Sequence, residues 1–214
     1  MGEITLTSLA GYVINNVPFI LEMMAYHIFY SAIAIFAAAV IGIILGILSA
    51  RISRLSFLIN ISAVIQSAPD IVMLALMIPL LGIGPICALA ALFIKGVLPI
   101  IINTYAGIKN IKPGVVESAI GMGMSRSMIL FKIELPLALP VIMAGLRAAS
   151  VINVSTMTLA SYIGVNGLGI LIFRGIAMYE GNILIVGSIL TSLLAINTNF
   201  LCGYFEKRAI KWKQ

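Results

Sequence analysis

The sequence predicts an all-α fold, a polytopic membrane helix bundle with about five transmembrane helices. Hydrophobic residues make up 62% of the 214 residues and charged residues only 9%, and apolar runs of about twenty residues recur along the chain. Such runs are too long for the strands of a membrane barrel, and a backbone in lipid must satisfy its own hydrogen bonds. Spanning α-helices in a lipid bilayer are therefore expected.

The first span is predicted at Ile28 to Leu48, which contains no charged residue. The next apolar region runs from residue 55 to residue 108 and contains the segment Gly82-Ile83-Gly84-Pro85. Because glycine and proline favour a turn over a continuous helix, we divide this region into spans at 56–81 and 85–108. A single span across the turn is the alternative, but it would leave the apolar segments on either side outside any span.

Two further spans, at residues 137–160 and 182–204, complete the count and set the orientation. Lys and Arg are retained on the cytoplasmic side, and none precedes Arg51. With the N-terminus outside and the C-terminus inside, Arg174 alone among the loop cations lies outside. The cations placed inside are Arg51, Arg54, Lys109, Lys112, Arg126, Lys132, Lys207, Arg208, Lys211 and Lys213. The net charge of +6 then reflects membrane orientation, and no nucleic-acid partner is expected.

The polar loop at residues 109–136 is predicted to form an elbow on the cytoplasmic side. A short helix around Val115 to Ile120 leads into Gly121-Met122-Gly123. Ser125 can cap a second short helix, and Pro136 then opens the next span. A loop of this length with periodic apolar residues is more often functional than merely connecting. We therefore favour docking of a soluble partner over a plain connector.

No pattern of an active site is evident in the chain. The sequence contains no Walker A motif, no metal-ligand cluster and no G-x-S-x-G motif. The single histidine, His27, falls at a predicted membrane interface, where a packing role is favoured over a proton relay. No catalytic residue, metal or cofactor is expected.

Two ionisable residues fall near the middle of predicted spans. Asp70 follows Pro69, where the missing backbone N–H predicts a break in the helix, and Lys95 lies in the next span. Charged groups at this depth face a partner or a cavity. An ion pair between Asp70 and Lys95 offsets the desolvation of both charges and is favoured over a site that faces a cavity.

The span at 137–160 is unusually polar. Arg147 lies among small residues that allow close helix approach, and we expect it to bond to carbonyls or to an acidic neighbour at a helix contact. Further along, Asn153, Ser155 and Thr156 are candidates for lining a pathway, although Ser and Thr also bond back to their own helix.

Residues 164–176 contain glycines followed by a short apolar run. The run is too short to span again, so we expect a turn and a re-entrant or interfacial helix. Two roles remain possible for this segment: it could gate the outer mouth, or it could be an ordinary surface loop with a small helix.

The elbow resembles a known family. The spacing Glu117-x-Ala119-x3-Gly123-x9-Ile133-x-Leu135-Pro136 is similar to the EAA motif of ABC importer permease subunits, with Ser118 where alanine is usual. From about residue 30 to residue 205 the chain resembles the osmoprotectant branch, which imports glycine betaine, carnitine, choline and related quaternary ammonium compounds. The segments that carry this resemblance are PLLGIG at 79–84, NTYAGIKNI at 103–111, GMGM at 121–124, LPLALPVIMAGLRAA at 135–149 and LIFRGI at 171–176. Asp70, Lys95, Ile152 and Ser155 depart from that branch's pattern.

The resemblance implies a single permease domain over residues 1–214 in the plasma membrane of a prokaryote, with residues 109–136 as its coupling loop. Two permease subunits, identical or different, would form the pathway, and an extracytoplasmic binding protein would deliver the solute. Cytoplasmic ABC ATPase subunits would bind the loops and hold ATP and Mg²⁺, so this chain is not expected to be an enzyme. A rigid helix at 118–126 would act as the lever. The coupling residues implied are Glu117, Ser118, Ala119, Gly121, Gly123, Met124, Ser125 and Arg126.

Two alternatives stay open. Permeases for an amino acid such as methionine have a similar length and the same elbow. An autonomous carrier or channel would work without an ATPase and usually carries an internal repeat, which is not evident here. No cluster of aromatic residues predicts a quaternary ammonium cage, so selectivity is expected to lie in the binding protein.

Overall fold

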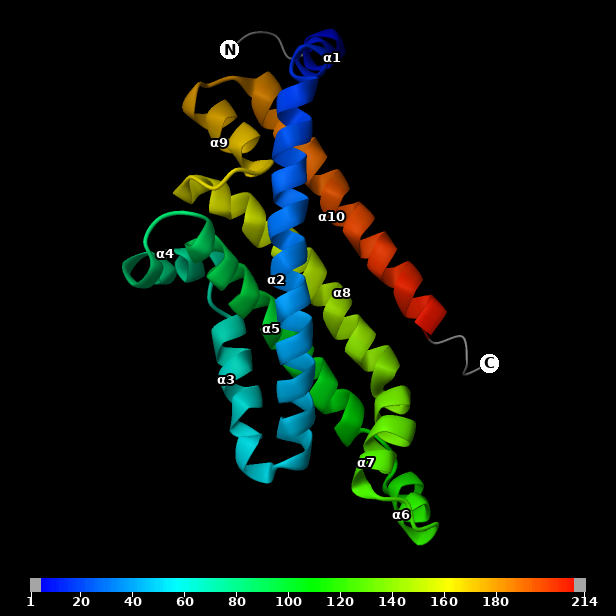
Figure 1. Cartoon of the computed structure of the whole chain (residues 1–214). Helices are drawn as coiled ribbons and strands as arrows, with labels where there is room; N and C mark the ends of the chain where they lie inside the picture. The colour runs from blue at the N-terminus through cyan, green and yellow to red at the C-terminus, as the bar shows by residue number, and fades with distance from the viewer. Residues whose placement is uncertain (1–4, 210–214) are drawn as a thin grey trace.

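The computed structural model describes residues 5–209. Four long helices run along the molecule: α2 (Val17–Arg51), α5 (Pro85–Lys109), α8 (Leu135–Ala160) and α10 (Gly181–Ala209) (Figure 1). α2 packs along α5 and α8, and α10 packs against α8. The predicted all-α membrane fold is confirmed.

Within residues 5–209, four helical segments are long and apolar enough to cross a membrane, at residues 17–51, 85–109, 126–163 and 181–208. A fifth segment passes the same test only as a pair of helices, with a bend of 105° between them. The predicted count of five spans is therefore reached only if this broken pair crosses once.

The broken pair is α3 (Phe57–Gln66) and α4 (Asp70–Leu81), and it follows a short 3₁₀ turn, η1 (Ser53–Leu55). The sequence predicted one span over residues 56–81 with a break near Pro69. The break is present, but the bend turns the span into two separate helices, because Pro69 adopts an extended ψ of 144° that no helix continues through. After α4, Gly82 and Gly84 have φ values of 76° and 135°, which confirms the predicted turn before α5.

The chain before residue 28 is more helical than the sequence predicted. α1 (Leu6–Asn15) begins at a capping box in which the side chains of Thr5 and Ser8 each accept the other's backbone N–H. α2 then begins at Val17, so the first span predicted at Ile28–Leu48 covers only part of its helix. Hydropathy identifies only the apolar part of a helix. The helix itself extends as far as its backbone hydrogen bonds continue, which is beyond that apolar part.

The elbow differs from the prediction in how its second arm is connected to the next span. α6 (Pro113–Gly121) is a separate short helix, but α7 (Arg126–Ile129) continues through a π-helical turn, η2 (Leu130–Glu134), into α8. Pro136 lies in the first turn of α8, so it opens this span as predicted, at a position where a missing N–H is tolerated. The second arm of the elbow is thus continuous with a spanning helix.

The opposite end of the molecule carries α9 (Gly169–Ala177), which follows the 3₁₀ turn η3 (Ser161–Ile163) (Figure 1). α9 is too short to span, as predicted, and packs closely on α10, where a Cβ at Gly187 would lie 2.7 Å from Leu171 Cβ. Arg174 on α9 lies over the Phe19 ring of α2, 5.2 Å from its centroid.

Small residues bring α2, α5 and α8 close together. A Cβ added at Gly42 or Gly46 of α2 would lie 2.8 Å from Ile100 Cβ or 2.5 Å from Thr104 Cβ of α5. Gly145 of α8 meets Asn103 of α5 in the same way. The three helices therefore leave little freedom to slide past one another.

Candidate functional site

The elbow turns at Gly123, after α6 ends. The N–H of Gly123 donates to the carbonyl of Ile120 at 2.9 Å, and the N–H of Met124 donates to the carbonyl of Ala119 at 3.1 Å. These two bonds cap the last carbonyls of α6 while Gly123 takes a φ of 78°. The backbone at this corner favours glycine, and a Cβ built there meets no atom within 4 Å.

The second arm begins at Ser125, whose Oγ accepts the N–H of Met128 at 3.3 Å, as predicted. The expectation of a rigid lever helix over residues 118–126 is wrong, because α6 stops at Gly121 and residues 122–125 form the corner. Ala119 on α6 and Ile129 on α7 are buried, and they form the apolar interior of the elbow.

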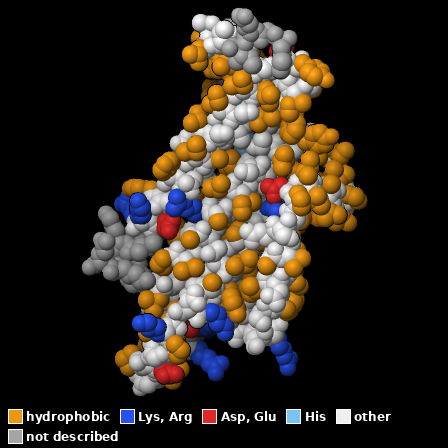
Figure 2. Space-filling model, turned by 180° about the vertical axis from the view of Figure 1, so that it is seen from behind, with side chains coloured by type: hydrophobic (Ala, Val, Ile, Leu, Met, Phe, Trp, Pro, Cys, Tyr) orange, Lys and Arg blue, Asp and Glu red, His pale blue; other side chains and the backbone are white. Residues whose placement is uncertain are grey.

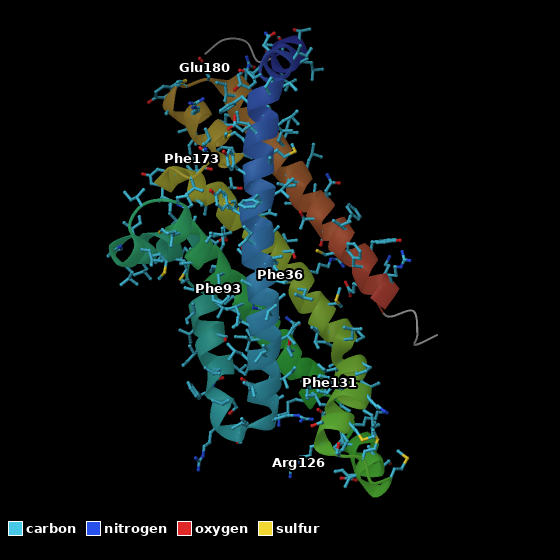
Figure 3. All side chains as sticks on the ribbon, viewed as in Figure 1. Phe36, Phe93, Arg126, Phe131, Phe173 and Glu180 are labelled. Atoms are coloured by element: carbon cyan, nitrogen blue, oxygen red, sulfur yellow. The ribbon has the colours of Figure 1, made fainter. Side chains whose placement is uncertain are left out.

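The outer surface of the elbow is apolar although the elbow lies beyond the spanning α5. Ile120 is 60% exposed and Met122 is 73% exposed. Phe131, on the second arm, is labelled beside Arg126 in Figure 3, at the end of the molecule opposite Glu180. Glu117 is exposed and forms no ion pair within residues 5–209. Ile120 and Met122 are exposed together outside the spans, and they form a surface suited to a protein partner.

Basic residues gather at this same end of the molecule (Figure 2). Arg51 ends α2 and Arg54 lies in the turn that follows it, and the elbow carries Lys109, Lys112, Arg126 and Lys132. This grouping agrees with the predicted cytoplasmic end, whereas Lys211 and Lys213 lie outside the described residues.

Arg51, the last residue of α2, reaches across to the elbow. Its Nη2 atom donates to the Glu134 carboxylate at 2.7 Å and to the Arg126 carbonyl at 3.2 Å. The two arms of the elbow and Arg51 enclose an open hollow of about 430 Å³. Sequence reasoning treated Arg51 only as a marker of orientation and did not foresee this contact, because nothing local connects Arg51 to a residue 83 positions away.

The helix break between α3 and α4 holds the charged cluster that the sequence predicted. Lys95 Nζ lies 2.8 Å from Asp70 Oδ1, so the predicted ion pair is present. The Lys95 side chain is only 5% exposed, and it also donates to the carbonyls of Gln66 and Ala68 at 3.3 and 2.7 Å. The lysine thus satisfies carbonyls at the end of α3 and pairs with the first residue of α4.

The three polar candidates on α8 do not share one surface. Thr156 Oγ1 donates to Asp70 Oδ2 at 2.9 Å and is fully buried. Asn153 is also fully buried, with its amide against Gly96 of α5. Ser155 lies on the exposed side of the helix and bonds back to the Val151 carbonyl. Only Thr156 therefore joins the Asp70 cluster.

Arg147 makes a helix contact with acceptors on α10, as predicted. Its Nε donates to Asn199 Oδ1 at 2.7 Å, and its Nη1 lies 3.4 Å from Glu206 Oε2. This contact ties the middle of α8 to the C-terminal half of α10.

His27 is fully buried among helices, which agrees with the packing role expected for it. Its Nε2 lies 3.0 Å from the Val154 carbonyl of α8, and its Nδ1 accepts the N–H of Leu168 at 3.3 Å. These two bonds require Nε2 to carry the proton and leave neither nitrogen free for chemistry.

Within residues 5–209, no three or more His, Cys, Asp or Glu side chains are grouped so that they could hold a metal ion. The elements with functional geometry are the exposed elbow and the charged cluster at the helix break.

Comparisons with known proteins agree on one family. Residues 38–211 match the family model described as "Binding-protein-dependent transport system inner membrane component". The chain is 39% identical over 204 residues to the glycine betaine/carnitine/choline transport system permease protein OpuCD of Bacillus subtilis, covering 94% of this chain and 89% of the relative. It is 38% identical over 205 residues to the carnitine transport permease protein OpuCD of Listeria monocytogenes, covering 95% and 92%. The fold is similar to a chain of the MetNI methionine ABC transporter in an inward-facing conformation, with a TM-score of 0.79, 21% identity, and coverage of 89% of this chain and 95% of that one.

Proposed function

Because this chain belongs to the family of binding-protein-dependent transport system inner membrane components, we propose that it is a permease subunit of an ATP-driven ABC importer for osmoprotectants. The names of its relatives give the solute class as carnitine, glycine betaine and choline, which are quaternary ammonium compounds. The likeness to a methionine transporter, at 21% identity, concerns the fold alone and does not favour an amino acid.

The exposed elbow is the observation that carries this proposal. It projects from the basic end of the molecule, and it presents Ile120 and Met122 around a left-handed glycine corner. A groove on an ATPase subunit would cover these side chains, and the absence of a side chain at Gly123 would allow the groove to approach the backbone. Glu117 and Arg126 lie in the exposed arms and supply charge for contacts at the rim.

The ATPase subunits would bind ATP with Mg²⁺, so this chain itself needs no cofactor. A second permease subunit completes the pathway, and an extracytoplasmic binding protein supplies solute selectivity; the family description names this dependence on a binding protein. The loop at residues 109–136 is the coupling region of a permease domain that covers residues 1–214. An autonomous carrier has no comparable support, since the elbow would then have no partner.

Affinity purification of the tagged chain in mild detergent, followed by mass spectrometry, tests the proposal. The wild type should recover an ABC ATPase and Gly123→Trp should lose it, because the new side chain fills the approach to the corner and strains its positive φ. Gly11→Trp is the matched control, since Gly11 lies in α1 at the opposite end and a Cβ there also meets nothing within 4 Å. The control should recover as much ATPase as the wild type.

Recovery of no ATPase with a folded wild-type chain would overturn the proposal and favour the autonomous carrier. Uptake assays with labelled carnitine, glycine betaine, choline and methionine test the solute class. Uptake of methionine in preference to the three quaternary ammonium compounds would overturn the osmoprotectant assignment while leaving the importer class intact.

A further inference from the structure

Arg51 joins two parts of the chain that the backbone does not connect directly. It ends α2, while its partners Arg126 and Glu134 belong to the second arm of the elbow, 75 and 83 residues later. One guanidinium nitrogen, Nη2, makes both contacts, and the Glu134 side chain is only 12% exposed. The Glu134 carboxylate is therefore partly desolvated, while Arg51 keeps 31% of its side chain exposed.

The π-helical turn between α7 and α8 bears directly on this contact. Glu134 is the last residue of that turn. A π-helical turn is wider than an α-helical one, so it rotates the residues that precede it about the helix axis relative to α8. Leu135 and Pro136 follow immediately, where α8 begins. Arg51 thus binds at the joint between the elbow arm and its spanning helix.

On its other side, Arg51 belongs to a tightly packed unit. The last turns of α2 lie against α5, where Cβ atoms at Gly42 and Gly46 would come within 2.8 Å of α5 side chains. Because the two helices are closely packed, a displacement of α2 is transmitted to α5. A force that reaches Arg51 therefore reaches the end of α2 and its partner α5.

We propose that Arg51 is a positioning residue that couples movement of the elbow to α2 through Glu134 and the Arg126 carbonyl. This inference rests on the proposed function, since the force comes from an ATPase bound to the elbow. Covalent continuity already joins the elbow to α5 through residues 110–112 and to α8 through η2. The Arg51 contact also links α2 to the elbow. Without this contact, α2 would move with the elbow only through side-chain packing.

The test compares the reconstituted transporter complex carrying wild type, Arg51→Ala, Glu134→Ala, or the exchange Arg51→Glu with Glu134→Arg. Arg54→Ala is the matched control, since Arg54 lies three residues away in the same turn, is exposed, and forms no ion pair within residues 5–209. Three quantities are measured for each variant: the recovered ATPase, the rate of ATP hydrolysis, and the solute transported per ATP hydrolysed.

Arg51→Ala and Glu134→Ala should retain the ATPase and hydrolyse ATP within twofold of wild type, while solute transported per ATP falls at least fivefold. The charge exchange should restore at least half of that ratio, and Arg54→Ala should equal wild type. A ratio unchanged in Arg51→Ala would overturn the inference, as would loss of the ATPase from that variant, because Arg51 would then maintain only the shape of the elbow. If the wild type itself binds no ATPase, the proposed function fails, and this inference fails with it.

Discussion

Lys95 of α5 lies at the gap between α3 and α4, with its Nζ atom 2.8 Å from Oδ1 of Asp70, the first residue of α4. The lysine also donates hydrogen bonds to the carbonyls of Gln66 and Ala68, so three oxygen atoms surround its ammonium group. The cation lies at the C-terminal end of α3 and the carboxylate lies in the first turn of α4, and each charge is favourable at that helix end. The 105° bend is thus stabilised by the same pair that neutralises two charges at membrane depth.

Breaking this pair from one side should be more harmful than removing both charges. Asp70→Asn leaves Lys95 buried beside carbonyls alone and should lower the free energy of unfolding by about 3 kcal/mol, the low end for a buried pair because Asp70 keeps 25% of its side chain exposed. The double variant Asp70→Asn with Lys95→Leu should recover at least half of that loss. Chemical unfolding in detergent measures both, and additive losses in the double variant would contradict the pairing.

Thr156→Val should weaken the cluster from the side of α8. The substitution removes the hydroxyl that donates to Asp70 Oδ2 at 2.9 Å and should cost about 1.5 kcal/mol of unfolding free energy, as for a hydrogen bond to a charged group. Thr158→Val is the control, since its hydroxyl bonds only to the Val154 carbonyl of its own helix and should cost less than about 0.5 kcal/mol. Equal losses in the same unfolding experiment would show that the Asp70 contact adds nothing.

Gly46→Ala should push α2 away from α5. The added Cβ would lie 2.5 Å from Thr104 Cβ, and relieving that overlap should cost about 2 kcal/mol, as for overpacking in a core. Gly11→Ala serves as the control, because its Cβ meets nothing within 4 Å and alanine favours a helix by up to about 1 kcal/mol over glycine. Thermal unfolding of the two variants in detergent should move the midpoint in opposite directions. A Gly46→Ala protein as stable as the wild type would refute the close approach.

His27→Leu should loosen the outer segment that precedes α9. It leaves the N–H of Leu168 without its acceptor in a buried position, which should cost about 2 to 3 kcal/mol. Amide hydrogen exchange should speed up at Leu168 in particular. Phe29→Leu is the control on the same helix, since Phe29 is 58% exposed and its replacement should leave that amide protected. Unchanged exchange at Leu168 in His27→Leu would rule out the bond.

Several features of the site were accessible from the sequence because they depend on local chemistry. The pairing of Asp70 with Lys95 followed from the cost of two lone charges at bilayer depth, and the break at Pro69 followed from a missing N–H. The corner at Gly123 and the cap at Ser125 followed from residue types that favour those backbone positions. Thr156 was a candidate, but its bond to Asp70 was not foreseen, because that bond depends on how α8 approaches the break.

The sequence by itself determined that the chain is a helical membrane protein, where most of its spans lie, and where its elbow turns. Those properties follow from hydropathy, basic residues, glycine and proline, all of which act within a few residues along the chain. The tertiary structure decided that residues 56–81 form two helices, that α7 continues into α8, and that His27 is buried. It also decided that Arg51 binds Glu134, 83 residues away. Contacts of this kind depend on the distances and angles between packed helices, which are set by the whole bundle rather than by any single segment.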